Sequence, residues 1–171
     1  AQVPMLDGMA AVRAVPLPRL LRFGLYAMAD LFKPGHPIYL PVVSKPGAFS
    51  SMDRDDAGKA LQLAETSIGR RYDNRVAARS MMTMGPYRPF KRLKDIRIPT
   101  LLLGASQDSV APFVESAIRK INNPNLTIAS IEANHFEPYF EPAFSGVIRK
   151  QLAFLEGLDG FVQAANHRKS A

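Results

Sequence analysis

The sequence of 171 residues contains no cysteine. This absence excludes disulfide bonds, a cysteine nucleophile and any metal site built from thiolates. Long apolar runs are also lacking, because Arg, Pro or Gly interrupts every stretch before it reaches the roughly 18 residues of a membrane-spanning helix. We therefore expect no membrane span and take the cytoplasm as the default location.

The sequence also lacks the patterns that hold metals or phosphates. Glu132 and Glu137 flank His135, but this spacing on a predicted loop is not specific for a metal site. No glycine-rich loop that could cradle a phosphate occurs. We expect neither a cofactor nor a bound metal.

Positive charge is concentrated in one segment. Residues 70–97 hold nine basic and two acidic side chains, which accounts for the whole net charge of +7. A basic patch can mark a nucleic-acid site, and binding that falls steeply with salt would support that hypothesis. Because no nucleic-acid-binding motif accompanies the charge, we interpret the segment as a solvated helix face with a basic loop and expect no nucleic-acid partner.

The chain divides into two parts of different character. Residues 97–157 alternate between strand and helix patterns, whereas 9–96 show helix and loop patterns with many Pro and Gly. We expect 9–96 to form a mostly helical lid. Residues 1–8 are expected to end a core strand and enter a loop, and residues 158–171 to form a frayed tail.

The second part predicts an α/β fold. Residues 98–104 form a continuous apolar run typical of a strand buried on both faces, and 126–131 predict a second strand. Apolar residues at helical spacing predict helices over 112–121 and 143–155. Strand, helix and strand in this order form a βαβ unit, so the two strands should be parallel and adjacent.

The first part predicts one or two helices over 9–33, an irregular segment over 38–52 and a helix over 73–84. A further helix should begin at Asp53, a good N-cap with Asp56 three residues later, and reach about Thr66. Methionine and aromatic residues are frequent in this part. They form either a core between helices or the lining of an apolar acyl or aryl pocket.

Asp108 and His135 are the candidate site residues. Each follows one of the two predicted strands at its carboxyl end, where open parallel sheets bind their ligands. A carboxylate can accept the Nδ1–H of an imidazole, and the other ring nitrogen can then take a proton from a hydroxyl nucleophile. The alternatives are that Asp108 only caps the helix near Pro112 and that His135 is simply solvated.

These residues also carry a resemblance. The segment 99–112 with Asp108, the segment 134–139 with His135 and the residues 151–155 resemble the end of an α/β-hydrolase. In that family the last two core strands are followed by the acid and then the histidine of a catalytic triad. The resemblance implies the C-terminal part of such a fold, with parallel strands and crossover helices, and a catalytic role for Asp108 and His135.

The family's nucleophile is missing from this chain. No G-x-S-x-G elbow occurs, and neither Ser106 nor Ser145 has the glycines that such an elbow requires. The resemblance implies that the serine and the oxyanion hole lie upstream, in a missing N-terminal half that would be a partner of this chain. We expect a hydrolase of an ester, amide or related bond in a small-molecule, acyl or peptidyl substrate, inactive as this chain alone; the alternative is a non-catalytic binding protein of the same fold.

Overall fold

A computed structural model describes residues 1–33, 35–54 and 57–169, with side chains described to residue 158. Two parallel strands form its centre, β3 (Thr100–Ala105) and β4 (Leu126–Ile131). Their register pairs Thr100 with Leu126 and Ala105 with Ile131. The predicted βαβ unit is therefore confirmed, and β4 has the predicted bounds.

The N-terminal residues form a third extended segment beside β3. Gln2 bridges Leu103 in parallel, the N–H of Val3 donates to the carbonyl of Leu103 at 2.8 Å, and the N–H of Leu103 donates to the carbonyl of Ala1 at 2.9 Å. Since β4 pairs with the other side of β3, β3 has an extended neighbour on each side. Within the described residues, no strand pairs with the outer edge of residues 1–3.

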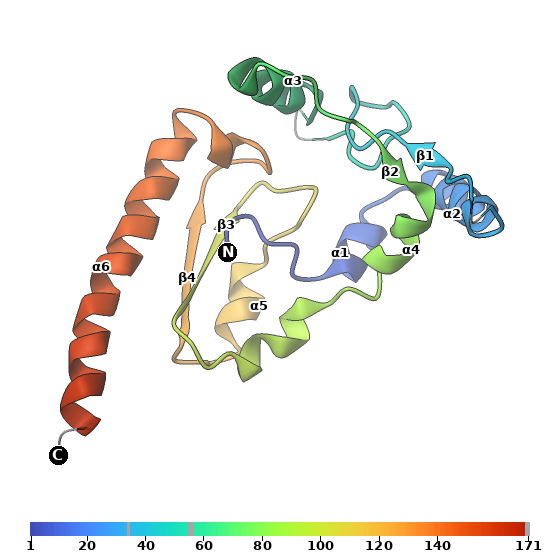
Figure 1. The fold of residues 1–171 in the computed structure, drawn as a ribbon. Helices are drawn as coiled ribbons and strands as arrows, with labels where there is room; N and C mark the ends of the chain where they lie inside the picture. Colours follow the sequence, from blue (N-terminus) through green and yellow to red (C-terminus); the bar gives the residue numbers. More distant parts are fainter. Residues whose placement is uncertain (34, 55–56, 170–171) are drawn as a thin grey trace.

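Both faces of β3 are buried, which explains its uninterrupted apolar sequence. On one face Leu102 packs against Leu6, Leu93 and Ile118 of α5 (Glu115–Arg119). On the other face its neighbours Leu101 and Leu103 pack against Val147 of α6 (Ala143–Lys169). Figure 1 shows α5 and α6 on opposite sides of the strand pair.

The two crossover helices differ in length from the expectation. Helix α5 begins at Glu115, not at Pro112, because residues 109–111 turn around the carboxylate of Asp108. Helix α6 continues to Lys169 instead of ending at Leu155, so the backbone of 158–169 is helical and not a frayed tail. None of the described helices is both long and apolar enough to cross a membrane.

The remaining elements gather on one side of the strand pair (Figure 1). They are α1 (Gly8–Arg13), α2 (Leu17–Leu31), β1 (Tyr39–Leu40), α3 (Ala57–Ile68), β2 (Val76–Ala77), the 3-10 turn η1 (Ala78–Ser80), α4 (Met81–Met84) and the 3-10 segment η2 (Pro89–Asp95). We call this part, residues 9–96, the lid. Most of its regular elements are helices or 3-10 turns.

Two lid predictions need correction. The helix predicted over 73–84 is helical only in its second half, because Val76 and Ala77 pair antiparallel with β1. The helix predicted from Asp53 begins at Ala57. Asp53 does not cap it but binds Arg19, and Asp56 lies outside the described residues.

A buried carboxylate joins the helices of the lid. Asp30 of α2 is fully buried and accepts hydrogen bonds from the guanidinium of Arg79 at 2.8 and 3.1 Å, from the backbone N–H of Arg79 and from that of Ile38. The hydrogen bonds from Arg79 hold the pKa of Asp30 well below its usual range. The carboxylate is therefore ionised and satisfied, as a buried charge must be.

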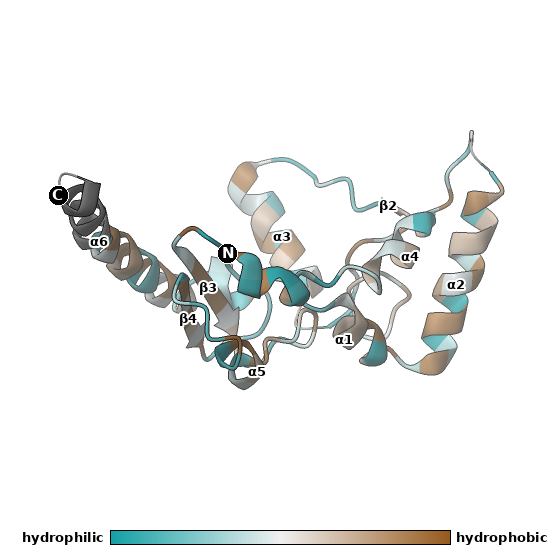
Figure 2. Ribbon diagram, turned by 90° about the horizontal axis from the view of Figure 1, so that it is seen from below, coloured by the Kyte–Doolittle hydropathy of each residue, from teal (hydrophilic) through white to brown (hydrophobic). Residues whose placement is uncertain are grey.

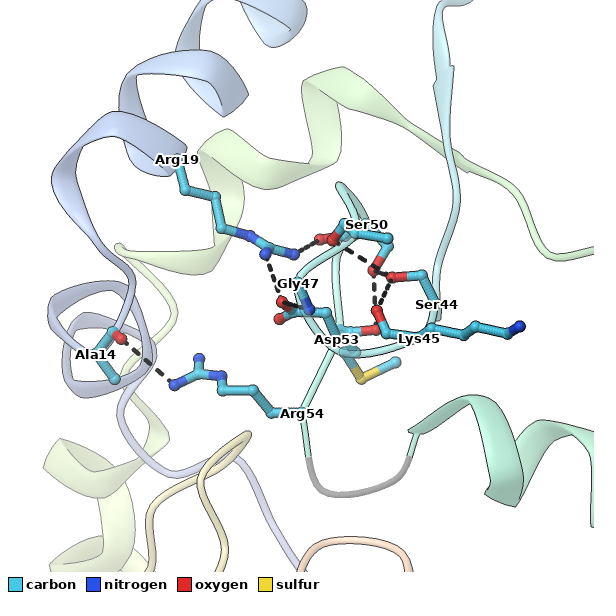
Figure 3. Close-up of polar contacts among 10 residues, drawn as sticks. Ala14, Arg19, Ser44, Lys45, Gly47, Ser50, Asp53 and Arg54 are labelled. Atoms are coloured by element: carbon cyan, nitrogen blue, oxygen red, sulfur yellow. Dashed lines mark hydrogen bonds and ion pairs between the residues drawn. The ribbon is translucent and has the colours of Figure 1, made fainter.

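A second polar network fixes the N-terminal half of α2 to the loop of residues 44–53 (Figure 3). The guanidinium of Arg19 donates to Asp53 Oδ2 at 2.5 Å and to the carbonyl of Ser50 at 2.6 Å. The buried hydroxyl of Ser50 lies 2.6 Å from that of Ser44 and donates to the carbonyl of Met52. Together with Asp30, this network fixes the rotation of α2 about its axis.

Gly8 allows α1 to approach the backbone of α4. A Cβ at this position would lie 1.7 Å from the carbonyl oxygen of Met84, which cannot move without displacing α4. We predict that Gly8→Ala lowers the free energy of unfolding by at least about 2 kcal/mol. The control is Gly24→Ala in α2, where nothing lies within 4 Å; it should raise the free energy by up to about 1 kcal/mol. Urea unfolding measures both, and equal effects would contradict the assigned contact.

Candidate active site

Asp108 lies in the turn that follows β3. The backbone beyond β3 stays bonded to the backbone beyond β4, since Ser106 N–H donates to the carbonyl of Ile131 at 2.9 Å and Gln107 N–H to that of Ala133 at 3.0 Å. The parallel pairing thus continues past the ends of the strands. It brings the turn with Asp108 next to the loop with His135.

The structure brings the two predicted residues into direct contact. His135 Nδ1 lies 2.8 Å from Asp108 Oδ2, which is a hydrogen-bond distance. The side chain of Asp108 is fully buried, and that of His135 is 17% exposed. With the proton on Nδ1, the imidazole donates to the carboxylate and its tautomer and orientation are fixed.

The second oxygen of Asp108 organises the turn. Asp108 Oδ1 accepts hydrogen bonds from the backbone N–H of Val110 at 2.9 Å and of Ala111 at 2.6 Å. The capping hypothesis for Asp108 is therefore correct for this turn but not for α5, which begins at Glu115. The same carboxylate therefore orients His135 through Oδ2 and holds the turn through Oδ1.

The loop that carries His135 is closed by a reciprocal pair that the sequence analysis missed. Asn134 Oδ1 accepts hydrogen bonds from the N–H of Phe136 and of Glu137, and Glu137 Oε2 accepts one from the N–H of Asn134 at 2.7 Å. This is the geometry of a capping box, here built with Asn at its first position. The sequence signal that could have predicted this pair is the spacing N-x-x-E of Asn134 and Glu137. Glu137 therefore positions the loop.

The negative charge of Asp108 also affects Tyr139. Burial raises the pKa of Tyr139, and the nearby carboxylate of Asp108 raises it further because a second negative charge is unfavourable there. Tyr139 belongs to the short 3-10 turn η3 (Glu137–Tyr139) that follows the His135 loop. This turn and the Asp108 turn thus face each other at the end of the strands.

Of the other two histidines, only His36 has a described side chain, and it is not part of this site. His36 lies exposed in a turn of the lid, and the side chain of His167 lies outside the described part of the chain. In the part of the chain that the structure describes, no three His, Asp or Glu side chains gather in a way that could hold a metal.

Two cavities adjoin the Asp108–His135 pair from different sides. A pocket of about 390 Å³ lies between α3 and the loop of residues 132–143, and its walls include Asn134, Phe136 and Lys59. On the side of the Asp108 turn, Val110 borders a cavity of about 80 Å³. One cavity thus borders each of the two loops that carry the pair.

The cavity beside Val110 continues into the lid. The 80 Å³ cavity shares Val15, Ser51 and Met84 with a second cavity of about 310 Å³ between α1, α2 and α4. The two cavities together, which we call the methionine groove, are lined by five methionines and by other side chains that are mostly apolar. Its methionines are Met5, Met52, Met81, Met82 and Met84, with Met84 in both cavities.

Comparison with known proteins identifies relatives of about twice this length. No protein-family model matches the sequence. The chain is 31% identical over 160 residues to the quorum-quenching protein AidA of Acinetobacter baumannii. The alignment covers 91% of this chain and 52% of the relative. The chain thus spans about half the length of the curated relative that it matches.

Two solved structures show the same arrangement of elements. The α/β-hydrolase GrgF of Penicillium sp. matches with a TM-score of 0.54 and 16% identity, over 91% of this chain and 53% of that one. The structure of DcsB with its substrate analogue matches with a TM-score of 0.57 and 14% identity, over 90% and 53%. The chain has an α/β-hydrolase fold. The α/β-hydrolase resemblance drawn from residues 97–157 is thereby confirmed.

The reciprocal hydrogen bonds of Asn134 and Glu137 lead to a prediction about the His135 loop. Glu137→Ala removes one half of the capping box and should lower the free energy of unfolding by about 1 kcal/mol. The matched control is Glu132→Ala, an exposed carboxylate beside the same loop, which should change it by less than about 0.5 kcal/mol. Thermal unfolding of both variants measures the two effects. If Glu137→Ala leaves the free energy of unfolding unchanged, Glu137 does not stabilise the His135 loop.

Proposed function

We propose that Asp108 and His135 are the acid and the base of a Ser-Asp-His triad in a hydrolase that cleaves an ester, amide or related bond. The observation that carries the proposal is the 2.8 Å contact between His135 Nδ1 and the buried carboxylate of Asp108 at the carboxyl ends of two parallel strands. Buried carboxylates that orient an imidazole in this way are typical of triads.

In the proposed mechanism, His135 Nε2 takes the proton of a serine hydroxyl while the serine oxygen attacks the substrate carbonyl. Asp108 stabilises the imidazolium that forms, and its burial prevents competing hydrogen bonds with water. His135 then gives the proton to the leaving group, which departs as the acyl-enzyme forms. Water, deprotonated by the same nitrogen, hydrolyses the acyl-enzyme and restores the serine.

The serine of this proposal belongs to a segment upstream of the chain. Two observations support this assignment: the sequence has no G-x-S-x-G elbow, and the chain aligns with about half of each relative. The outer edge of residues 1–3 gives the upstream part a strand to pair with. In α/β-hydrolases the elbow lies at the end of a strand of the same sheet, on the same rim as Asp108 and His135.

The methionine groove favours a substrate with an aliphatic acyl group. Its lining is mostly apolar, with Ser51 and Arg54 as the polar members, and it reaches from the lid to Val110, whose N–H donates to Asp108. Methionine side chains adapt to unbranched chains because they have several rotatable bonds and no branch point. Because the A. baumannii relative is named a quorum-quenching protein, quorum quenching is the first biological role to assay for the full-length protein.

The role of Asp108 is tested in the full-length protein with an aryl ester as substrate. Asp108→Asn should lower kcat by about ten-thousand-fold, because the amide no longer stabilises the imidazolium or the correct tautomer. The control is Asp95→Asn, which alters an exposed ion pair with Arg92 and should leave kcat unchanged. Near-normal turnover of Asp108→Asn would remove Asp108 from the mechanism.

A fluorophosphonate probe separates the hydrolase from the alternative, a non-catalytic binding protein of the same fold. The proposal predicts labelling of one serine in the full-length protein, and the alternative predicts none.

The role of the methionine groove is tested by filling it. Gly24 lines the groove, and a Cβ added there meets no atom within 4 Å, so we expect Gly24→Leu to fold and to reduce the free space of the groove. We predict that Gly24→Leu reduces kcat/KM for a ten-carbon acyl ester at least about tenfold, the effect of losing several buried methylenes, and spares the acetyl ester. Ala29→Leu, on an exposed position of the same helix, should change neither value. An equal loss for both esters would contradict acyl binding in the groove.

A further inference from the structure

Helix α2 and its C-terminal residue Phe32 expose an uninterrupted apolar stripe. At about 100° per residue, six large apolar side chains fall within an arc of about 120° that contains no charged residue. They are Leu17 (66% exposed), Leu21 (62%), Leu25 (72%), Met28 (44%), Leu31 (46%) and Phe32 (79%). We call this set the α2 stripe. Exposed apolar patches of this kind mark interaction sites.

The stripe cannot turn inward, because the opposite side of α2 is already fixed. Phe23, Ala27 and Asp30 are buried on that side, and Asp30 is bound by Arg79. The network of Arg19 with Asp53 and Ser50 fixes the N-terminal half of the helix (Figure 3). Figure 2 shows α2 at the outer edge of the lid, at the far end of the molecule from α6.

The surroundings of the stripe are positively charged. Within the described residues of 8–50 there is one acidic side chain, Asp30, and it is fully buried. The basic side chains of the same range are Arg13, Arg19, Arg22, Lys33 and Lys45. Arg19 is paired with Asp53, whereas Arg13, Arg22 and Lys33 are exposed, and each lies in α2 or within four residues of its ends in the sequence. The exposed surface around α2 therefore carries a net positive charge.

We propose that the α2 stripe docks on an anionic lipid surface, with the helix lying in the plane of the headgroups. Leucine, methionine and phenylalanine on one face and arginine or lysine beside it are the features of helices that lie in a membrane interface. Anionic headgroups would neutralise Arg13, Arg22 and Lys33. A second copy of the chain fits less well, because docking stripe to stripe would bring the same cations of two molecules together.

Cosedimentation of the full-length protein with lipid vesicles tests this proposal. Vesicles of phosphatidylcholine mixed with phosphatidylglycerol should bind the protein, pure phosphatidylcholine should bind it much less, and added salt should weaken the binding. Leu25→Ser should reduce partitioning about tenfold, the effect of losing one buried leucine. The control is Ile68→Ser at the end of α3, which is 63% exposed and outside the stripe; it should bind like the wild type.

Three outcomes would overturn the proposal. They are the absence of binding to both kinds of vesicle, equal binding to both, and equal losses in Leu25→Ser and Ile68→Ser. Light scattering tests the alternative that a second copy of the chain binds the stripe. If the protein is a dimer, Leu25→Ser dissociates it and no vesicle binding is seen, the stripe is a self-association surface. Because Leu25 is exposed, circular dichroism should show unchanged folding in the variant.

Discussion

The in-register parallel pairing of β3 with β4 is the constraint on which the site depends. Because Ala105 pairs with Ile131, the two strands end at the same level and their loops leave side by side. The hydrogen bonds from Ser106 and Gln107 to the opposite backbone extend this alignment by two residues. A shift of one residue in this register would turn the side chains of β4 to the other face and separate Asp108 from His135.

Two kinds of contact then convert this alignment into a defined geometry. Asp108 is held through the backbone of Val110 and Ala111, and the His135 loop is held through the capping box of Asn134 and Glu137. Each loop thus has hydrogen bonds of its own between a side chain and its backbone. The bond between the two side chains therefore joins two prearranged parts, as preorganised sites require.

The strand pair and the Asp108–His135 contact could be predicted from the sequence, because buried parallel strands leave a strong apolar signal and the polar residues follow them directly. The lid was harder. Val76 and Ala77 lie in a segment of helical pattern, yet their pairing with Tyr39 and Leu40 decides their conformation. Asp53 has the chemistry of a helix cap, but Arg19, 34 residues away in the sequence, takes its carboxylate. Such long-range partners have no local signature.

The lid places two apolar surfaces on different sides of a single helix. The inner side of α2 borders the methionine groove with Phe23 and Ala27, and the outer side carries the α2 stripe. Asp30 and Arg19 fix the helix between them, so the two sides cannot exchange. Under our proposals, the inner side selects the acyl group and the outer side determines where in the cell the substrate is met.

The central claim is that a serine from another part of the polypeptide completes the pair of Asp108 and His135. A crystal structure of the full-length protein after reaction with a fluorophosphonate tests it most directly. We predict a phosphonylated serine whose oxygen lies within hydrogen-bond distance of His135 Nε2. A label on a residue remote from His135, or an unlabelled protein in which Asp108 and His135 still form their hydrogen bond, would contradict it.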